Sequence, residues 1–133
     1  MIDARKAEDL RQAQEFAEQK TEEARLAGID VTKARRKARM ASQRAWDQRN
    51  NLEDVRDRRD MEIARRAGGG ISEAAEAERD ARASASVAAE TAAEAWRCTQ
   101  QAEWADAAWV RASRAAHEAR LRAEEIAGSS AAA

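Results

Sequence analysis

Apolar and small side chains recur at helical spacing along most of the chain, and glycines interrupt the pattern at two places. From residue 31 to residue 67 such a side chain returns every three or four positions, and only Gln48 and Arg59 break the pattern. This spacing is typical of a helix that buries one narrow stripe against a partner helix. The members of the stripe are Val31, Ala34, Ala38, Ala41, Ala45, Gln48, Leu52, Val55, Arg59, Ile63 and Ala67. The pattern predicts a helix over residues 31–67.

The segments on either side carry similar stripes. Before Gly28, a stripe predicts a helix over residues 2–27 through Ala7, Leu10, Ala13, Ala17 and Ala24. Glycine is common directly after a helix, so Gly28 is expected to end this one. After the glycines at 68–70, a third stripe predicts a helix over residues 72–127. Its members are Ala74, Ala77, Ala81, Ala85, Ala88, Ala92, Ala95, Thr99, Ala102, Ala105, Trp109, Ala112, Ala116, Ala119, Ala123 and Ile126.

These helices predict an all-α fold, either an elongated antiparallel helical hairpin or a three-helix coiled-coil bundle with a long C-terminal helix. One helical domain is expected over residues 1–127, followed by a disordered tail over 128–133. Folding the second helix back on the third about the glycines places Val31 near residue 107. With a turn at Gly28, the third helix then overhangs from about residue 108.

The expected overhang carries large apolar side chains into water. Exposed apolar residues on a protruding helix favour association, most simply with a second copy of the chain. We therefore predict a homo-oligomer, with another protein as a further partner. The residues expected to mediate contact are Trp109, Leu121 and Ile126.

Composition changes the picture of the core. The chain has 36 alanines, whereas Ile, Leu, Val and Phe together number 14. Alanine is the strongest helix former, and the chain has no proline to break a helix. We expect long helices that pack closely on small side chains. Trp96, Trp104 and Trp109 are expected to form a small aromatic plug near the Gly28 connection, and Trp46 is expected to fill a similar role on the second helix.

The net charge of -1 conceals a basic block. Residues 31–46 contain no acidic side chain and six basic ones, which are Lys33, Arg35, Arg36, Lys37, Arg39 and Arg44. One interpretation is a helix that contacts phosphates of nucleic acid. The other is that both flanks of this helix pair with the acidic segments before and after it. The first interpretation assigns Lys33, Arg36, Lys37 and Arg44 to DNA contact.

The stretch around the second glycine interruption carries a motif of its own. Ala77, Ala81 and Val87 occupy the fifth, ninth and fifteenth positions of a helix-turn-helix pattern. The residues leading into it match as well, at Asp60, Ile63, Gly70, Ile71 and Ser72. Over residues 60–87 the chain thus resembles short helix-turn-helix proteins of high-GC bacteria. The resemblance implies a DNA-binding regulator whose groove-facing residues are Arg82, Ser84 and Ser86.

The same stretch also has an interpretation as one long helix. Four positions at which the helix-turn-helix pattern needs apolar side chains are charged, namely Glu76, Asp80, Arg82 and Glu90. Burying four charges between two short helices costs more free energy than such a unit gains. Alanine at the turn position also favours an uninterrupted helix.

Candidate chemistry is sparse. His117 and Cys98 are the only histidine and cysteine, and position 114 is an arginine, so the Glu-x-x-His pair of a di-metal bundle is missing. We predict no enzyme activity, no cofactor and no metal. With no apolar run of membrane-spanning length and a lone cysteine, the expected location is the cytoplasm, away from membranes. The predicted function is protein–protein interaction or assembly, and DNA binding is the alternative.

Overall fold

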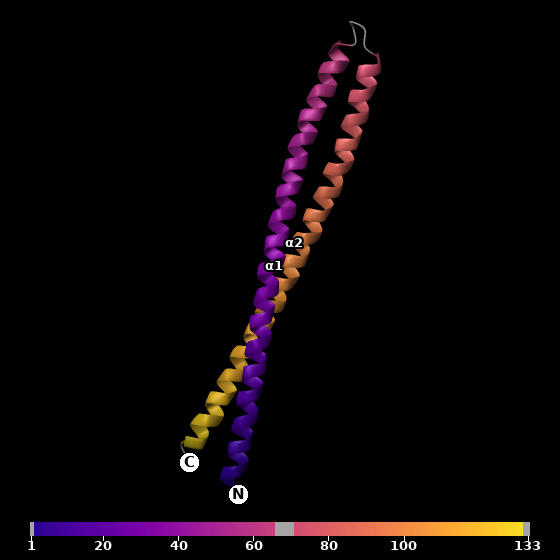
Figure 1. Cartoon of the computed structure of the whole chain (residues 1–133). Helices are drawn as coiled ribbons and strands as arrows, with labels where there is room; N and C mark the ends of the chain where they lie inside the picture. The colour runs from indigo at the N-terminus through magenta and orange to yellow at the C-terminus, as the bar shows by residue number, and fades with distance from the viewer. Residues whose placement is uncertain (1, 66–70, 132–133) are drawn as a thin grey trace. The chain divides into compact units, whose positions relative to one another are not determined.

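The computed structural model describes residues 2–65 and 71–131, which form two long helices (Figure 1). Helix α1 runs Ile2–Arg65 and helix α2 runs Ile71–Ala131. These described ranges contain no strand, so the predicted all-α class is confirmed. The chain is a two-helix hairpin, and the predicted three-helix arrangement is wrong.

Helix α1 passes through Gly28, where the sequence predicts a helix end. The backbone at Gly28 is helical, and the Thr32 hydroxyl donates a hydrogen bond to the Gly28 carbonyl oxygen over 3.1 Å, as happens inside a helix. Glycine costs about 1 kcal/mol relative to alanine in a helix interior, which long helical segments on both sides can absorb. One glycine therefore does not stop this helix.

The described residues of the paired helices belong to two compact units. Unit 1 combines Met1–Ala34 with Gln101–Ala133, and unit 2 is Arg35–Gln100. In unit 1 the C-terminal part of α2 is covered by the start of α1, since Ala116 and Ala119 are only 2% and 5% exposed. The predicted overhang from residue 108 is therefore wrong, because α1 continues past Gly28 alongside α2.

The side chains that α1 buries or half-buries recur in a repeat of seven residues, which we call the α1 seam. Its members are Leu10, Ala13, Ala17, Lys20, Ala24, Ala27, Val31, Ala34, Ala38, Ala41, Ala45, Gln48, Leu52, Val55, Arg59 and Glu62. The predicted stripe matches this seam from Val31 to Arg59. It fails at Ile63, which is 47% exposed. Steps of three and four residues alternate along the seam, and the three-residue step after Arg59 reaches Glu62.

Helix α2 has a seam with the same repeat. Its members are Ala74, Ala77, Ala81, Ser84, Ala88, Thr91, Ala95, Cys98, Ala102, Ala105, Trp109, Ala112, Ala116, Ala119, Ala123 and Ile126. Two of the predicted positions are wrong, because Ala92 and Thr99 are exposed and Thr91 and Cys98 occupy the seam instead. The predicted Ala85 is half-buried, as is its neighbour Ser84. Alanines are so frequent here that apolar character alone did not distinguish adjacent positions.

The stretch that resembles a helix-turn-helix is one uninterrupted helix from residue 71 to residue 87. Ala81, at the position where the motif turns, is helical and 3% exposed. The glycines at 68–70 and the stripe member Ala67 lie outside the described residues. At the other end, α2 continues to Ala131, into the segment predicted as a tail, and residues 132–133 lie outside the description.

Candidate interaction surfaces

The hairpin places small side chains inside and large ones outside. Its buried apolar residues are mostly alanines, and Ala41, at 1% exposure, is the most completely buried. All four tryptophans keep large exposed fractions, with Trp46 at 61%, Trp96 at 65% and Trp104 at 69%. The predicted aromatic plug is therefore wrong. Two helices in contact along one narrow seam have room for alanine but cannot enclose an indole.

Trp109 is the tryptophan that the hairpin covers best, at 39% exposure. It is a seam residue of α2 in unit 1, and its indole lies against Gly28 of α1. A Cβ atom at position 28 would lie 3.2 Å from the Trp109 Nε1 atom. Gly28 thus acts as a gap in α1 that accommodates a side chain too large for the seam. This contact also agrees with the predicted register, which placed Val31 near residue 107.

A groove lies between the start of α1 and the end of α2 in unit 1. Phe16 and Ile126 give it apolar walls, and Lys6, Asp9, Arg122 and Glu125 add charges of both signs. A second, shallower hollow on α2 shares Arg122, Glu125 and Ile126 with this groove, and Leu121 borders it. The two hollows form one apolar and charged surface at this end of unit 1.

The three residues predicted to mediate association do not form one surface. Leu121 and Ile126 border the same hollow of unit 1, whereas Trp109 does not line it. Trp109 and Ile126 are also seam residues, so they pack against α1 of the same chain. Leu121 lies off the seam and is 44% exposed.

All six basic side chains of the predicted basic block are exposed. Arg44 reaches Glu94 across the hairpin, with 3.5 Å between Nη2 and Oε1. Arg35 also has an interaction partner. No ion pair between described residues includes Lys33, Arg36, Lys37 or Arg39. The predicted pairing of this block with acidic segments is therefore observed for Arg44.

The other residues assigned to DNA contact lie on different faces of α2. Arg82 is exposed and reaches Glu78 of its own helix, 3.6 Å from Nε to Oε1. Ser86 is exposed, but Ser84 is a half-buried seam residue. A single uninterrupted helix therefore does not present all three to one groove.

A pattern of a charged residue, an alanine and a tryptophan occurs twice in unit 2, once on each helix. Sequence analysis missed it. Arg44, Ala45 and Trp46 on α1 correspond to Glu94, Ala95 and Trp96 on α2. Ala45 and Ala95 are the seam residues, and the residues before them form the Arg44–Glu94 ion pair. The signal was present in the sequence as a charged residue, an alanine and a tryptophan, occurring twice with opposite charge.

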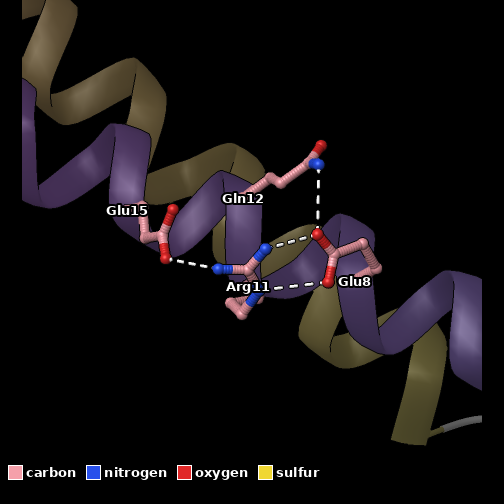
Figure 2. A network of polar contacts seen from close by, with 4 residues as sticks. All are labelled: Glu8, Arg11, Gln12 and Glu15. Carbon is pink, nitrogen blue, oxygen red and sulfur yellow. Dashed lines mark hydrogen bonds and ion pairs between the residues drawn. The ribbon is translucent and has the colours of Figure 1, made fainter.

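The N-terminal part of α1 carries a network of charged side chains on its surface (Figure 2). Arg11 donates hydrogen bonds to Glu8, 3.0 Å from Nε to Oε2, and to Glu15, 2.8 Å from Nη1 to Oε1. Gln12 donates a further bond to Glu8 over 3.3 Å. The hydrogen bond from Arg11 lowers the pKa of the Glu8 carboxyl, and Arg25 does the same for Glu22. Such pairs three and four residues apart stabilise the helix itself.

Residues with other chemistry are dispersed. Cys98 is a buried seam residue at 4% exposure, as expected for a small packing side chain, and His117 is exposed. The described ranges contain no group of three or more His, Cys, Asp or Glu side chains placed to hold a metal ion. Neither described helix has an apolar stretch long enough to cross a membrane.

No family model matches the chain, and neither a curated protein nor a solved structure shows significant similarity to it.

Proposed function

We propose that the chain is a non-catalytic helical interaction protein that associates with further copies of itself. The observation that carries this proposal is the placement of its large apolar side chains outside the hairpin. Two helices that pack along an alanine seam cannot enclose an indole, and Trp46 and Trp96 of unit 2 are each more than 60% exposed. Exposed apolar clusters of this kind mark interaction surfaces.

Covering these side chains provides a large driving force. An aromatic side chain can bury roughly 150–250 Å². At about 25 cal/mol for each Å², covering the exposed part of one such indole contributes on the order of 2–4 kcal/mol before the entropic costs of association are subtracted. A second copy is the simplest partner because it presents the same exposed surface. The lone cysteine is compatible with the cytoplasm as the proposed location.

The tryptophans themselves report on this proposal. Association should move them from water into an apolar contact, so their emission at high protein concentration should lie at shorter wavelength than after dilution. The expected result is a sigmoidal red shift on dilution at constant helix content. An emission spectrum of water-exposed indoles at every concentration would contradict self-association.

The three residues predicted from the sequence enter the proposal unequally. Substitution of Trp109 or Ile126 would disturb the seam of the hairpin. A loss of association could then come either from a lost contact between copies or from a destabilised hairpin. Leu121→Asp changes an exposed side chain off the seam, so we expect the hairpin to stay intact. This variant tests whether the C-terminal groove of unit 1 takes part in association.

DNA binding is the second candidate function. The observation in its favour is that Lys33, Arg36, Lys37 and Arg39 are exposed and have no ion-pair partner among the described residues. Free basic side chains on one helical segment can contact phosphates, and such binding weakens steeply as salt rises. Fluorescence anisotropy with a mixed-sequence duplex, at low and at physiological salt, tests this. Lack of binding at low salt would eliminate the candidate.

A further inference from the structure

The Arg44–Glu94 ion pair fixes which side chains share a flank of unit 2. Arg44 and Glu94 each directly precede a seam alanine, and they meet on one flank of the helix pair. Trp46 and Trp96 each directly follow the same two alanines. In an antiparallel helix pair, the residues that directly follow seam residues lie on one flank in both helices. The residues that directly precede seam residues lie on the opposite flank. Trp46 and Trp96 therefore lie on one flank of unit 2, which we call the Trp flank.

The Trp flank is open to solvent. Trp46 and Trp96 are 61% and 65% exposed. A shallow recess lies directly beside Trp46 on α1, lined by Ala38, Arg39, Ser42 and Gln43 in addition to Trp46 itself. An exposed indole next to a recess of small and polar side chains is suited to receive an indole from another molecule.

The charges along α1 on this flank identify the occupant. Arg39, Trp46 and Glu53 follow the seam residues Ala38, Ala45 and Leu52, so they form one line along the helix with the repeat of the seam. Arg39 and Glu53 are both exposed, and neither forms an ion pair with another described residue. Along this line the basic Arg39 comes first, then Trp46, then the acidic Glu53. Each charged residue lies about 10 Å from Trp46 along the helix axis.

This order of charges is complementary to itself when one copy is reversed. If two such lines meet in antiparallel fashion about Trp46, Arg39 of each copy opposes Glu53 of the other. Arg49, the remaining charge on this flank between Arg39 and Glu53, then opposes the polar side chains Ser42 and Gln43. A parallel arrangement would instead oppose identical charges. A two-fold symmetric contact needs a surface with this property.

We propose that a second copy of the chain docks antiparallel on the Trp flank, with Trp46 at the two-fold axis and two Arg39–Glu53 ion pairs at the ends of the line. This inference rests on the proposed self-association and specifies its surface. Tryptophan supplies affinity at interfaces, whereas exposed ion pairs mainly set register and specificity. Trp46 and Trp96 of the two copies together would bury on the order of 500 Å² of exposed indole surface. This is about a third of a standard protein–protein interface.

Charge reversal tests the antiparallel register. Arg39→Glu places two acidic residues opposite each other at both ends of the line, and Glu53→Arg places two basic ones there. We expect each variant to raise the dimer Kd by about fivefold or more at low salt. An equimolar mixture of the two variants should recover the wild-type Kd, because every contact is then between opposite charges. The double variant Arg39→Glu/Glu53→Arg should recover it as well.

The indole at the centre is tested with a matched control. Trp46→Ala should raise the dimer Kd at least about tenfold. Trp104→Ala removes a tryptophan of similar exposure from unit 1 and should leave the Kd unchanged. Sedimentation velocity measures Kd for each variant. Circular dichroism verifies that helix content is retained, as expected for exposed positions.

The outcomes separate this inference from the broader proposal. A wild-type chain that sediments as a monomer at all concentrations contradicts self-association itself. A dimer that is unaffected by Trp46→Ala, and whose charge variants do not recover on mixing, contradicts the Trp flank as its interface. A dimer that is lost with Leu121→Asp instead would place the interface at the C-terminal groove. Recovery on mixing together with loss in Trp46→Ala supports the inference.

Discussion

Trp109 and Gly28 show how one pair of residues adapts the seam of unit 1 to a side chain that is too large for it. The Trp109 indole occupies a position where its helix otherwise carries mostly alanine. It fits because position 28 has no Cβ atom to meet the indole nitrogen at 3.2 Å. The glycine that resembled a helix end in the sequence is explained by this contact. Its role depends on a partner 81 positions away, at Trp109, and no local pattern contained that information.

This contact predicts an energetic coupling between the two positions. In a Trp109→Ala background, Gly28→Ala should stabilise the hairpin by about 0.5–1 kcal/mol, because alanine has the higher helix propensity. With Trp109 present, the gain should be smaller, since the added Cβ crowds the indole. Urea unfolding of the wild type, both single variants and the double variant gives the coupling energy. Equal effects of Gly28→Ala in both backgrounds would contradict the contact.

The charged network at the start of α1 predicts a dependence on pH. Hydrogen bonds from Arg11 and Arg25 hold the pKa of Glu8 and Glu22 below the ordinary value for glutamate. The folded helix therefore favours their ionised forms, and this stabilisation is complete above the ordinary pKa. It is lost as the pH falls through the lowered values.

We expect helix stability to fall on acidification from neutral pH to below the ordinary pKa of glutamate. The Glu8→Gln/Glu22→Gln variant should lose less stability over the same range. Thermal unfolding followed by circular dichroism at both pH values, at low salt, measures the difference. Identical pH dependence of the two proteins would show that these pairs do not form in solution.

At the scale of the helices, the sequence predicts the periodicity well and the boundaries less well. From Val31 to Arg59 the predicted stripe is the observed α1 seam, because Val31, Leu52 and Val55 stand out there among charged residues. In α2 the stripe was misplaced at Ala92 and Thr99, because alanines there also occur off the seam. Helix ends were mispredicted at Gly28 because packing, and not propensity, decides whether one glycine ends a helix.

The seam assignment predicts which polar residue costs stability. Gln48 is a half-buried member of the α1 seam, whereas Gln19 of the same helix is exposed. Gln48→Leu should stabilise the hairpin by about 1 kcal/mol through additional apolar burial. Gln19→Leu should change stability by less than about 0.5 kcal/mol. Urea unfolding at one fixed protein concentration compares them, and destabilisation by Gln48→Leu would contradict the seam.

At the scale of the whole molecule, the composition predicts the kind of core but not the fate of the large side chains. Thirty-six alanines indicate close helix packing, and the buried residues are indeed mostly alanine. The tryptophans were expected inside, yet a seam of alanines leaves no room for them. The Arg44–Glu94 contact defines the flanks of unit 2 and so shows that Trp46 and Trp96 share one flank. The sequence pattern alone did not contain this information. The basic block stays a predicted DNA-contacting surface until binding is measured.

The central claim is that the exposed apolar side chains are covered by a second copy of the chain. Sedimentation equilibrium over a wide range of protein concentrations tests it most directly, because the mass of one chain is 14.7 kDa. We predict a mass that rises with concentration and reaches twice this value. Trp46→Ala should raise the dimer Kd. A mass of 14.7 kDa at every concentration would contradict the claim.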